Sequence, residues 1–149
     1  MNKFLSNLYS SSLYSDNTSG WCPAEDKEKA KSITRLLQYS DSNKHIKSIL
    51  DVGCGVGGIL SDVYDYLDGV HTCMGIDLSS IAIDMAKKNN STDIEFTTDS
   101  IFSITKTYDL VILSHILEHI DGWVDFIEKI KECADRYIYI NVPLEVNLM

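Results

Sequence analysis

The sequence predicts an α/β protein, built on a mainly parallel β-sheet that helices cover on both faces. Three observations support this fold class. From residue 46 onward, short apolar runs typical of buried strands alternate with segments of helical periodicity. Glycines cluster directly behind the first apolar run. The chain of 149 residues can form one domain with a substantial core, and it shows no internal repeats. Such alternation favours a parallel sheet with right-handed crossovers.

The first half of the chain supplies two helices and two strands. Strong helix formers fill residues 25–40, where one face carries Ile33, Leu36 and Leu37. The short polar segment "DSNK" ends this helix. The remaining elements of this half are a strand at residues 47–53, a helix at residues 57–67 and a strand at residues 71–78.

The second half continues the same alternation. A helix at residues 79–89 has Ser79 or Ser80 as its N-cap and ends at the pair of asparagines that follows. Three further strands are expected, at residues 94–99, 108–114 and 136–143. A helix at residues 121–135 separates the last two, and its apolar side carries Trp123, Phe126, Ile127 and Ile130.

Composition narrows the classes of partner. Hydrophobic residues make up 44% and charged residues 23% of the chain, as in soluble globular domains. The formal net charge of −9 repels phosphate backbones, so we expect no nucleic-acid partner. No apolar run approaches the roughly 20 residues that span a bilayer, so we expect no membrane partner either.

The cysteines and the N-terminus indicate the compartment. None of the four cysteines forms a C-x-x-C pair, which argues against a zinc site and predicts no bound metal. They are interpreted as reduced thiols. The first residues lack the continuous apolar region of a signal peptide. We therefore predict a cytoplasmic protein.

The glycine cluster in "SILDVGCGVGG" is the first functional signal. Gly53, Gly55 and Gly58 fit the pattern G-x-G-x-x-G, whereas Gly53, Gly55 and Gly57 fit G-x-G-x-G. In both cases the missing Cβ atoms let a ligand touch the main chain, next to the N-terminus of the following helix. The alternative is a tight turn between strand and helix without any ligand.

Acidic residues at three consecutive strand ends are the second signal. Asp51 precedes the glycines, where it would repel a pyrophosphate and suit a ligand with an amino group. Asp77 follows the second strand and can accept both hydroxyls of a ribose. Asp99 follows the third strand and can reach an adenine amino group, while Ile101 or Phe102 covers the ring. The alternative for Asp77 and Asp99 is simple helix capping.

At this point the motifs resemble a known family. The segments "ILDVGCGVGG", "GIDLS", "DSIF" and "YDLVILSHILEHI" are similar, in this order, to the motifs of class I S-adenosylmethionine-dependent methyltransferases. The resemblance covers about residues 46–143. It implies a Rossmann-like three-layer α/β/α sandwich and S-adenosyl-L-methionine as cofactor. The implied cofactor-binding residues are Asp51, Gly53, Cys54, Gly55, Gly57, Asp77, Leu78, Asp99, Ser100, Ile101 and Ser114.

The segment "SHILEHI" carries the candidate catalytic residues. We expect His115, Glu118 and His119 to share one face of a helical turn, since they lie three and four residues apart. Either histidine can be a general base toward an acceptor. Alternatively the three bind a divalent metal, as E-x-x-E-H does in some similar O-methyltransferases, although here His115 replaces the first glutamate. A third interpretation is structural, with Glu118 and His119 tying the loop to nearby backbone.

The two ends of the chain raise separate expectations. Residues 1–24 are predicted to form an N-terminal arm or a lid, whose aromatic residues Tyr9, Tyr14 and Trp21 contact the pocket or pack on the sheet. Residues 25–149 are predicted to form the methyltransferase domain. The sequence supplies a fifth strand but not the last two strands of the complete class I fold. We therefore expect either a C-terminally truncated domain or a second copy of the chain, as in a homodimer, at the open edge.

The sequence thus predicts an enzyme that transfers a methyl group from S-adenosylmethionine to a hydroxyl or amine of a small-molecule or sugar-linked acceptor. One alternative is a non-catalytic module that only binds S-adenosylmethionine. A nicotinamide-dependent oxidoreductase is another, against which Asp51 and the lack of an evident Tyr-Lys or Cys-His pair argue.

Overall fold

The structure is a computed structural model that describes residues 23–40 and 43–143. The α-helices are α3 (Pro23–Tyr39), α4 (Gly58–Tyr66), α5 (Ser80–Asn89) and α6 (Trp123–Cys133). Short 3₁₀ helices are η2 (Asn43–His45), η3 (Ile101–Ser103) and η4 (Leu117–His119). The strands are β1 (Ser48–Val52), β2 (Thr72–Ile76), β3 (Glu95–Thr97), β4 (Tyr108–Ser114) and β5 (Ala134–Asn141). The aromatic residues of the predicted arm lie outside the described residues.

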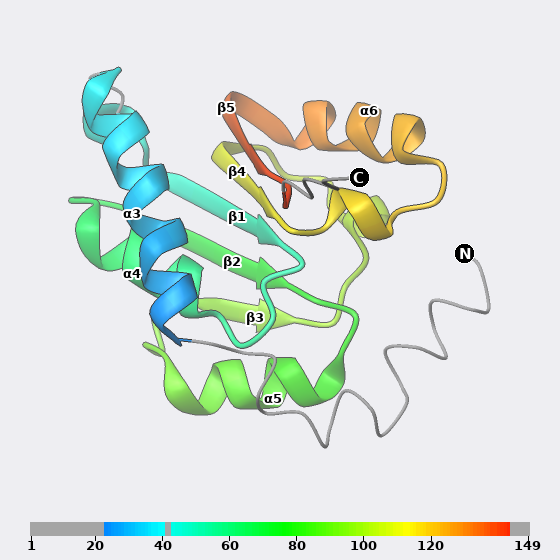
Figure 1. The fold of residues 1–149 in the computed structure, drawn as a ribbon, viewed down its shortest axis with the longest axis horizontal. Coiled ribbons are helices and arrows are strands. Elements are labelled where there is room, and N and C mark those ends of the chain that lie inside the picture. The colour runs from blue at the N-terminus through cyan, green and yellow to red at the C-terminus, as the bar shows by residue number, and fades with distance from the viewer. Residues whose placement is uncertain (1–22, 41–42, 144–149) are drawn as a thin grey trace, which may run out of the picture.

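The strands form one parallel sheet in the order β3-β2-β1-β4-β5 (Figure 1). This confirms the predicted fold class. The order reverses between β1 and β4, so the chain leaves their carboxyl ends in opposite directions. Ligands of open α/β sheets bind in the crevice at that point. The fold therefore places the residues after β1 and after β4 at the site where function is expected.

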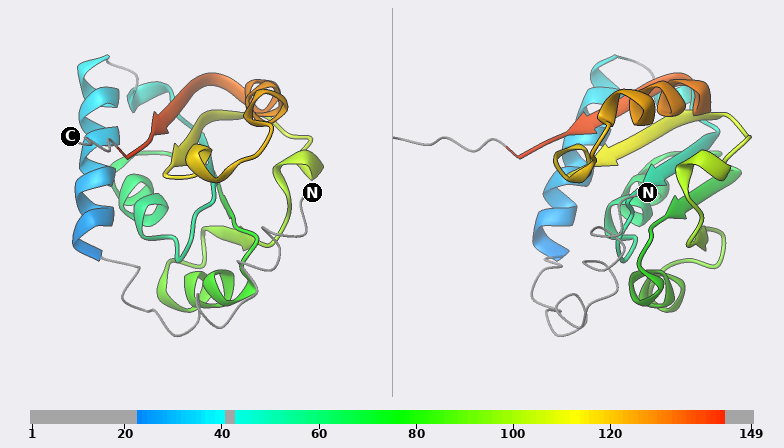
Figure 2. Two further views of the ribbon diagram at one scale, coloured as in Figure 1. Left: turned by 45° about the vertical axis from the view of Figure 1, so that its right-hand side comes forward. Right: turned by 90° about the vertical axis from the view of Figure 1, so that its right-hand side faces the viewer.

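Helices cover both faces of the sheet (Figures 1 and 2). One face packs against α3, α4 and α5, which contribute a cluster that includes Ile33, Leu60 and Ile83. The other face packs against α6 and the segment around η3, through Phe126 and Ile101. Alternate residues of β1 and β4 point into these two clusters, as expected for strands that are buried on both sides.

A polar clamp fixes the amino end of the sheet. One Asp109 carboxylate oxygen accepts hydrogen bonds from the backbone N–H groups of Lys47 (2.8 Å) and Ser48 (3.1 Å), and the other accepts one from Arg136 Nε (3.0 Å). Burial acts to raise the pKa of Asp109, but these bonds outweigh it and lower the pKa. The clamp joins β1, β4 and β5 at the end opposite the crevice.

Two expectations about helix faces are wrong. Trp123 is 60% exposed, although Phe126 and Ile130 of the same predicted side are buried. Side chains on a helix point back toward its N-terminus, so the indole of the first residue of α6 extends beyond the core. Leu36 is 56% exposed, because it lies beside the buried side of α3, which consists of Ala30, Ile33 and Leu37.

The last helix and strand also begin and end differently from the prediction. The α6 helix ends at Cys133, and β5 starts directly at Ala134, with no connecting loop. β5 is the edge strand of the described sheet, and its Ile138 and Ile140 are partly exposed. A second copy of the chain at this edge stays a prediction.

Within residues 23–40 and 43–143, no helix has the length and apolar character needed to cross a bilayer.

Candidate functional site

The loop after β1 has a backbone that requires its glycines. Gly53, Gly55 and Gly57 have φ angles of +75°, +54° and +80°, in the left-handed region that side chains disfavour. Neighbours also leave no room for side chains. A Cβ atom on Gly53 would collide with the Ile116 side chain, and one on Gly57 would lie 2.6 Å from Phe96 Cζ. The loop is therefore shaped both by its own conformation and by close packing.

Four N–H groups of this loop already donate hydrogen bonds within the protein. Gly53 N and Cys54 N both donate to Ile76 O, at 2.8 and 3.0 Å. Gly55 N donates to Asp77 Oδ2 at 2.9 Å, and Gly57 N donates to Cys54 O at 2.9 Å. Phosphate-binding loops work by presenting free N–H groups to the anion. This hydrogen bonding argues against a dinucleotide whose pyrophosphate rests on the loop.

Asp51 is a buried acid without a partner among the described residues. It is only 2% exposed, and its carboxylate accepts no hydrogen bond from residues 23–40 or 43–143. Burial first, and then the charges of Asp77 and Asp26, raise the pKa of Asp51 to about 8. An acid in this state gains most from a cationic partner, which is the ligand type predicted from its position before the glycines.

Asp77 connects the glycine loop to the start of α5. Its Oδ2 accepts the Gly55 N–H, and its Oδ1 accepts the Ser79 N–H at 2.8 Å. Burial raises the pKa of Asp77, and these two bonds oppose the rise. Ser79 itself caps α5, since its hydroxyl accepts the Ala82 N–H at 3.3 Å. The capping role predicted as an alternative for Asp77 thus belongs to Ser79, while each Asp77 oxygen keeps a second lone pair for a ligand.

In the segment after β3, one of the predicted site residues is buried in the core. Asp99 is exposed at the strand end and accepts a hydrogen bond from Thr97 Oγ1 at 2.9 Å. Ser100 caps η3 by accepting the Phe102 N–H at 3.3 Å. Ile101, one of the two residues expected to cover a ligand ring, is 4% exposed and belongs to the core cluster that contains Phe126 and Ile130 of α6.

Two apolar side chains that follow the ends of β2 and β3 are exposed and could contact a ligand. Phe102 is 61% exposed and Leu78, at the end of β2, is 51% exposed. Exposed apolar side chains beside strand-end carboxylates suit a flat, partly apolar ring. Of the two residues that we named for the ring, the structure favours Phe102.

The end of β4 carries a strained backbone and an unpaired hydroxyl. Ser114 Oγ is buried and has no hydrogen-bond partner among the described residues. The next residue, His115, has φ +55°, an uncommon conformation for a residue other than glycine. Its N–H donates to Asn141 O at 2.8 Å, which ties the end of β4 to the end of β5. Ile116 then packs onto Gly53, so this segment borders the glycine loop.

The expected helical turn through His115, Glu118 and His119 is wrong. The 3₁₀ turn η4 contains only Leu117–His119, and the left-handed backbone of His115 places it outside that turn. Glu118 Oε1 and His119 Nε2 lie 4.0 Å apart, too far for a hydrogen bond. Within the described part of the chain, no three His, Cys, Asp or Glu side chains are grouped to share a metal ion. The three residues therefore do not form the ligand set that we considered.

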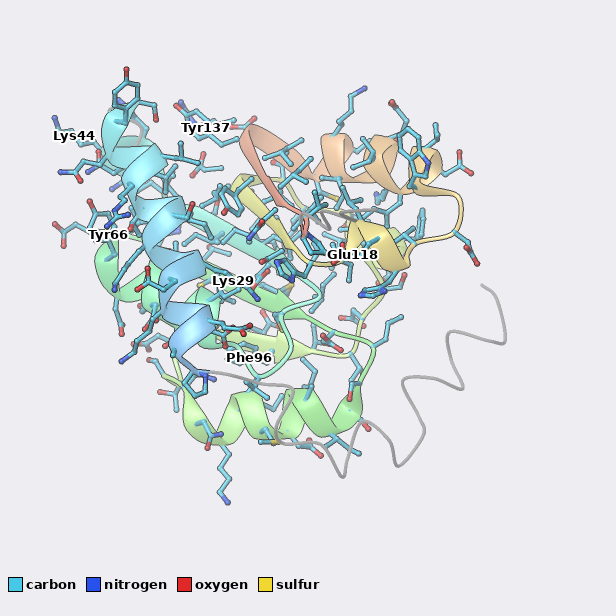
Figure 3. All side chains as sticks on the ribbon, viewed as in Figure 1. Lys29, Lys44, Tyr66, Phe96, Glu118 and Tyr137 are labelled. Carbon is cyan, nitrogen blue, oxygen red and sulfur yellow. The ribbon has the colours of Figure 1, made fainter. Side chains whose placement is uncertain are left out.

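Three residues that the sequence analysis did not assign to the site contact the glycine loop: Asp26, Asn90 and Phe96. Asn90, predicted only as a helix stop, donates from Nδ2 to Val56 O and to Ala86 O, both at 2.8 Å. The Phe96 ring packs under Gly57, in the region between β3 and α5 (Figure 3). Asp26 of α3 contacts Gly58, the first residue of α4. An asparagine at the end of a helix was the only sequence signal for Asn90.

A Gly57→Ala variant tests the packing of the loop. We expect it to lower the free energy of unfolding by about 2–4 kcal/mol, because a left-handed alanine is strained and its methyl group would overlap Phe96. Gly122→Ala is the matched control, since Gly122 has φ +72° but no atom within 4 Å of the added Cβ. The control should lose only about 1–2 kcal/mol. Equal losses in urea unfolding would contradict the packing argument.

Together, the parallel sheet, the glycine loop and the carboxylates at the crevice define a Rossmann-like class of α/β protein. Within that class, the chain belongs to the methyltransferase domain family, whose model matches residues 24–146. The predicted resemblance to class I S-adenosylmethionine-dependent methyltransferases is thereby confirmed.

Curated relatives share the central part of the chain. It is 38% identical over 82 residues to the mitochondrial ubiquinone biosynthesis O-methyltransferase of Candida albicans, which covers 50% of this chain and 25% of that protein. It is 36% identical over 94 residues to the protein of the same name from Schizosaccharomyces pombe, covering 58% and 33%. The chain thus spans a quarter to a third of the length of these relatives. Their names place those proteins in mitochondria, and a cytoplasmic location stays a prediction for this chain.

Solved structures share the fold. The plantazolicin methyltransferase BpumL, in complex with SAH, has a TM-score of 0.74 and 25% identity, covering 91% of this chain and 56% of that one. The magnesium protoporphyrin IX methyltransferase ChlM from Synechocystis PCC 6803, with bound SAM, has a TM-score of 0.62 and 21% identity, covering 74% and 55%.

Proposed function

We propose that this domain binds S-adenosylmethionine and that the protein transfers its methyl group to a hydroxyl oxygen of a small molecule. The observation that carries the proposal is a combination of two features. Asp51 is buried and has no partner among the described residues, and four N–H groups of the glycine loop, those of Gly53, Cys54, Gly55 and Gly57, are already bonded. Such a site disfavours phosphate and favours a nucleoside that carries a positive charge.

Each strand end has a role in holding this cofactor. Asp51 would pair with the ammonium group of the amino-acid tail, beside the bare main chain of Gly53 and Gly55. Asp77, which is held in place by two backbone N–H groups, would accept the ribose hydroxyls. Asp99 would accept the adenine amino group, and Phe102 would lie against the ring. The same edge would also be lined by Cys54, Gly57, Leu78, Ser100 and the backbone of Ile101, since these residues follow the carboxyl ends of β1, β2 and β3.

The end of β4 would handle the acceptor. S-adenosylmethionine supplies a methyl group that is already activated on a sulfonium, so the protein mainly has to align the acceptor and remove its proton. Strained backbone in folded proteins concentrates at functional sites. We propose that the His115 imidazole accepts the proton of the acceptor hydroxyl. The O-methyltransferase names of the fungal relatives favour a hydroxyl acceptor over an amine.

Calorimetric titration with S-adenosylhomocysteine and with NAD tests the cofactor. We expect the first to bind in the micromolar range and the second not to bind detectably. Binding of NAD instead would contradict the proposal and support the oxidoreductase alternative. Transfer of a labelled methyl group to small phenols then separates an enzyme from a module that only binds the cofactor.

A His115→Asn variant tests the base. Asparagine tolerates the left-handed backbone but cannot take a proton, so the fold and the affinity for S-adenosylhomocysteine should be retained. Methyl transfer should fall about 10²–10⁴-fold, the usual contribution of a general base. His71→Asn, which changes the residue just before β2 at the opposite edge of the sheet, is the control. An unchanged rate in the His115 variant would contradict the role of His115 as a base and favour a purely structural role for this segment.

A further inference from the structure

The outer edge of β5 lacks the features that usually protect an exposed strand. β5 is the last strand in the order β3-β2-β1-β4-β5, so among the described strands only β4 pairs with it. Folded proteins commonly protect such an edge with a lysine, an inward-pointing charge or a proline. The segment "IYINV" at residues 138–142 contains no charged residue and no proline. This edge is therefore suited to pair with another strand.

The outward-facing backbone groups of this edge belong to alternate residues. The C=O group of Asn141 is turned toward β4, because it accepts the N–H group of the first residue after β4 at 2.8 Å. Backbone groups of successive residues in a strand point to opposite sides. The N–H and C=O groups of Ile138 and Ile140 are therefore turned away from β4, and Val142 follows in the same phase.

The same three residues form a stripe of β-branched side chains. Ile138 is 38% exposed, Ile140 is 48% exposed and Val142 is 50% exposed. Residues two positions apart in a strand place their side chains on the same face. The register pairs Ile138 with Val111, which belongs to the core cluster on the side of α6. The stripe thus lies next to α6 at the end of the sheet (Figure 1) and is only partly covered by the described residues.

This stripe is complementary to itself in an antiparallel arrangement. Ile140 lies midway between Ile138 and Val142 in the sequence. A two-fold axis through Ile140 therefore sets Ile140 opposite Ile140 of a second copy, and Ile138 opposite Val142. On the other face, the same axis sets Tyr139 opposite Asn141. Cross-strand pairs of apolar side chains stabilise a sheet, and a two-fold axis lets one surface serve both copies.

We propose that two copies of this chain associate through antiparallel pairing of their β5 strands, with Ile140 at the two-fold axis. The pairing joins two sheets into one and covers the exposed stripe of both copies. An axis through Tyr139 would instead set Val142 opposite Arg136, whose Nε donates to Asp109 at 3.0 Å. The axis through Ile140 leaves that ion pair undisturbed. The competing occupant of the edge is another segment of the same chain.

Sedimentation equilibrium of the full chain tests the association. Over about 1–100 µM protein, we expect a dimer with a micromolar Kd. Higher salt should tighten it, since each copy carries a formal net charge of −9. Ile140→Lys should weaken it about 30-fold or more, because like charges then lie opposite each other near the centre of the interface. Leu36→Lys, which changes a similarly exposed residue of α3, is the matched control and should leave the Kd unchanged.

A mixture of two variants tests the register. Ile140→Lys and Ile140→Glu should each be monomeric when alone, because residue 140 faces itself across the axis. Mixed at low salt, the two should form a heterodimer, since a lysine then faces a glutamate. Added salt should weaken this heterodimer, in contrast to the wild-type dimer. A variant that merely failed to fold could not regain association on mixing.

Three results would overturn the proposal. A wild-type chain that stays monomeric over this range would favour a segment of the same chain at the β5 edge. A dimer that keeps its Kd in Ile140→Lys would assign the interface to another surface. If both variants are monomeric and remain so when mixed, residue 140 does not face itself, and the proposed pairing is wrong.

Discussion

An Asp77→Ala variant is expected to bind S-adenosylhomocysteine at least 100-fold more weakly than the wild-type protein. The variant would lose the two hydrogen bonds that the ribose hydroxyls are proposed to donate to the Asp77 carboxylate, and each is expected to contribute about 1.5–3 kcal/mol. The variant also leaves the N–H groups of Gly55 and Ser79 without their acceptor, which loosens the glycine loop. Calorimetry measures the affinity, and urea unfolding should show a loss of about 1–3 kcal/mol.

The control for Asp77 is Asp84→Ala, which removes an exposed acid from the following helix and should change neither quantity. The 5′-methylthioadenosine ligand, which keeps the ribose but lacks the amino-acid tail, should lose affinity for the Asp77 variant to a similar degree. An affinity within threefold of wild type would show that Asp77 only organises the loop and does not hold the ribose.

The second large effect is a pH dependence that depends on Asp51. Its pKa of about 8 means that the acid is mostly protonated at pH 6, and a cationic ligand must displace that proton in order to pair with the carboxylate. Affinity for S-adenosylhomocysteine should therefore rise by up to about tenfold for each pH unit between pH 6 and pH 8, and then level off. In an Asp51→Asn variant the binding should be weak and nearly independent of pH over this range.

The same acid should make the free domain less stable as the pH rises. The pKa of Asp51 is higher in the folded state than the usual 3.8, so the folded state holds a proton that the unfolded state has released. This contribution to stability is fully present below about pH 4 and is lost as the pH rises through about 8. Asp51→Asn should thus be more stable than wild type by on the order of 5 kcal/mol at pH 8, with little difference at pH 4, since each pKa unit of the shift corresponds to about 1.4 kcal/mol.

Urea unfolding of both proteins at several pH values checks the stability, and direct titration of proton uptake in two buffers checks the binding. A wild-type affinity that does not change between pH 6 and pH 8 would show that Asp51 is already ionised in the free protein. A parallel fall of stability in both proteins would assign the pH dependence to other groups, such as Asp77.

Much of the fold could be predicted from periodicity alone. Strand β4 has a continuous apolar run from Leu110 to Leu113, and α5 carries its own start signal in Ser79, so local sequence was sufficient. The glycine loop was also predictable, because left-handed backbone is a requirement of single residues. The edge at which the acids meet follows directly from the parallel arrangement of β1, β2 and β3.

What could not be predicted depends on contacts between distant segments. The 3₁₀ turn η4 is too short to have a period, so the residue at which it begins, after the left-handed His115, was missed. Ile101 and Phe102 are both apolar neighbours, and only the packing under α6 decides which one is buried. The bond from Asn90 to Val56 spans 34 residues and leaves no local pattern.

The buried carboxylate of Asp51, which has no partner in the described part of the chain, also has a consequence for the life of the protein in a cell. Because a bound cation would relieve the cost of burying Asp51, the occupied form should resist unfolding and proteolysis better than the empty one. Steady-state abundance would then follow the supply of methyl donor and of its spent product, which share the same tail. Cells starved of methionine should contain less of this protein, even at constant synthesis.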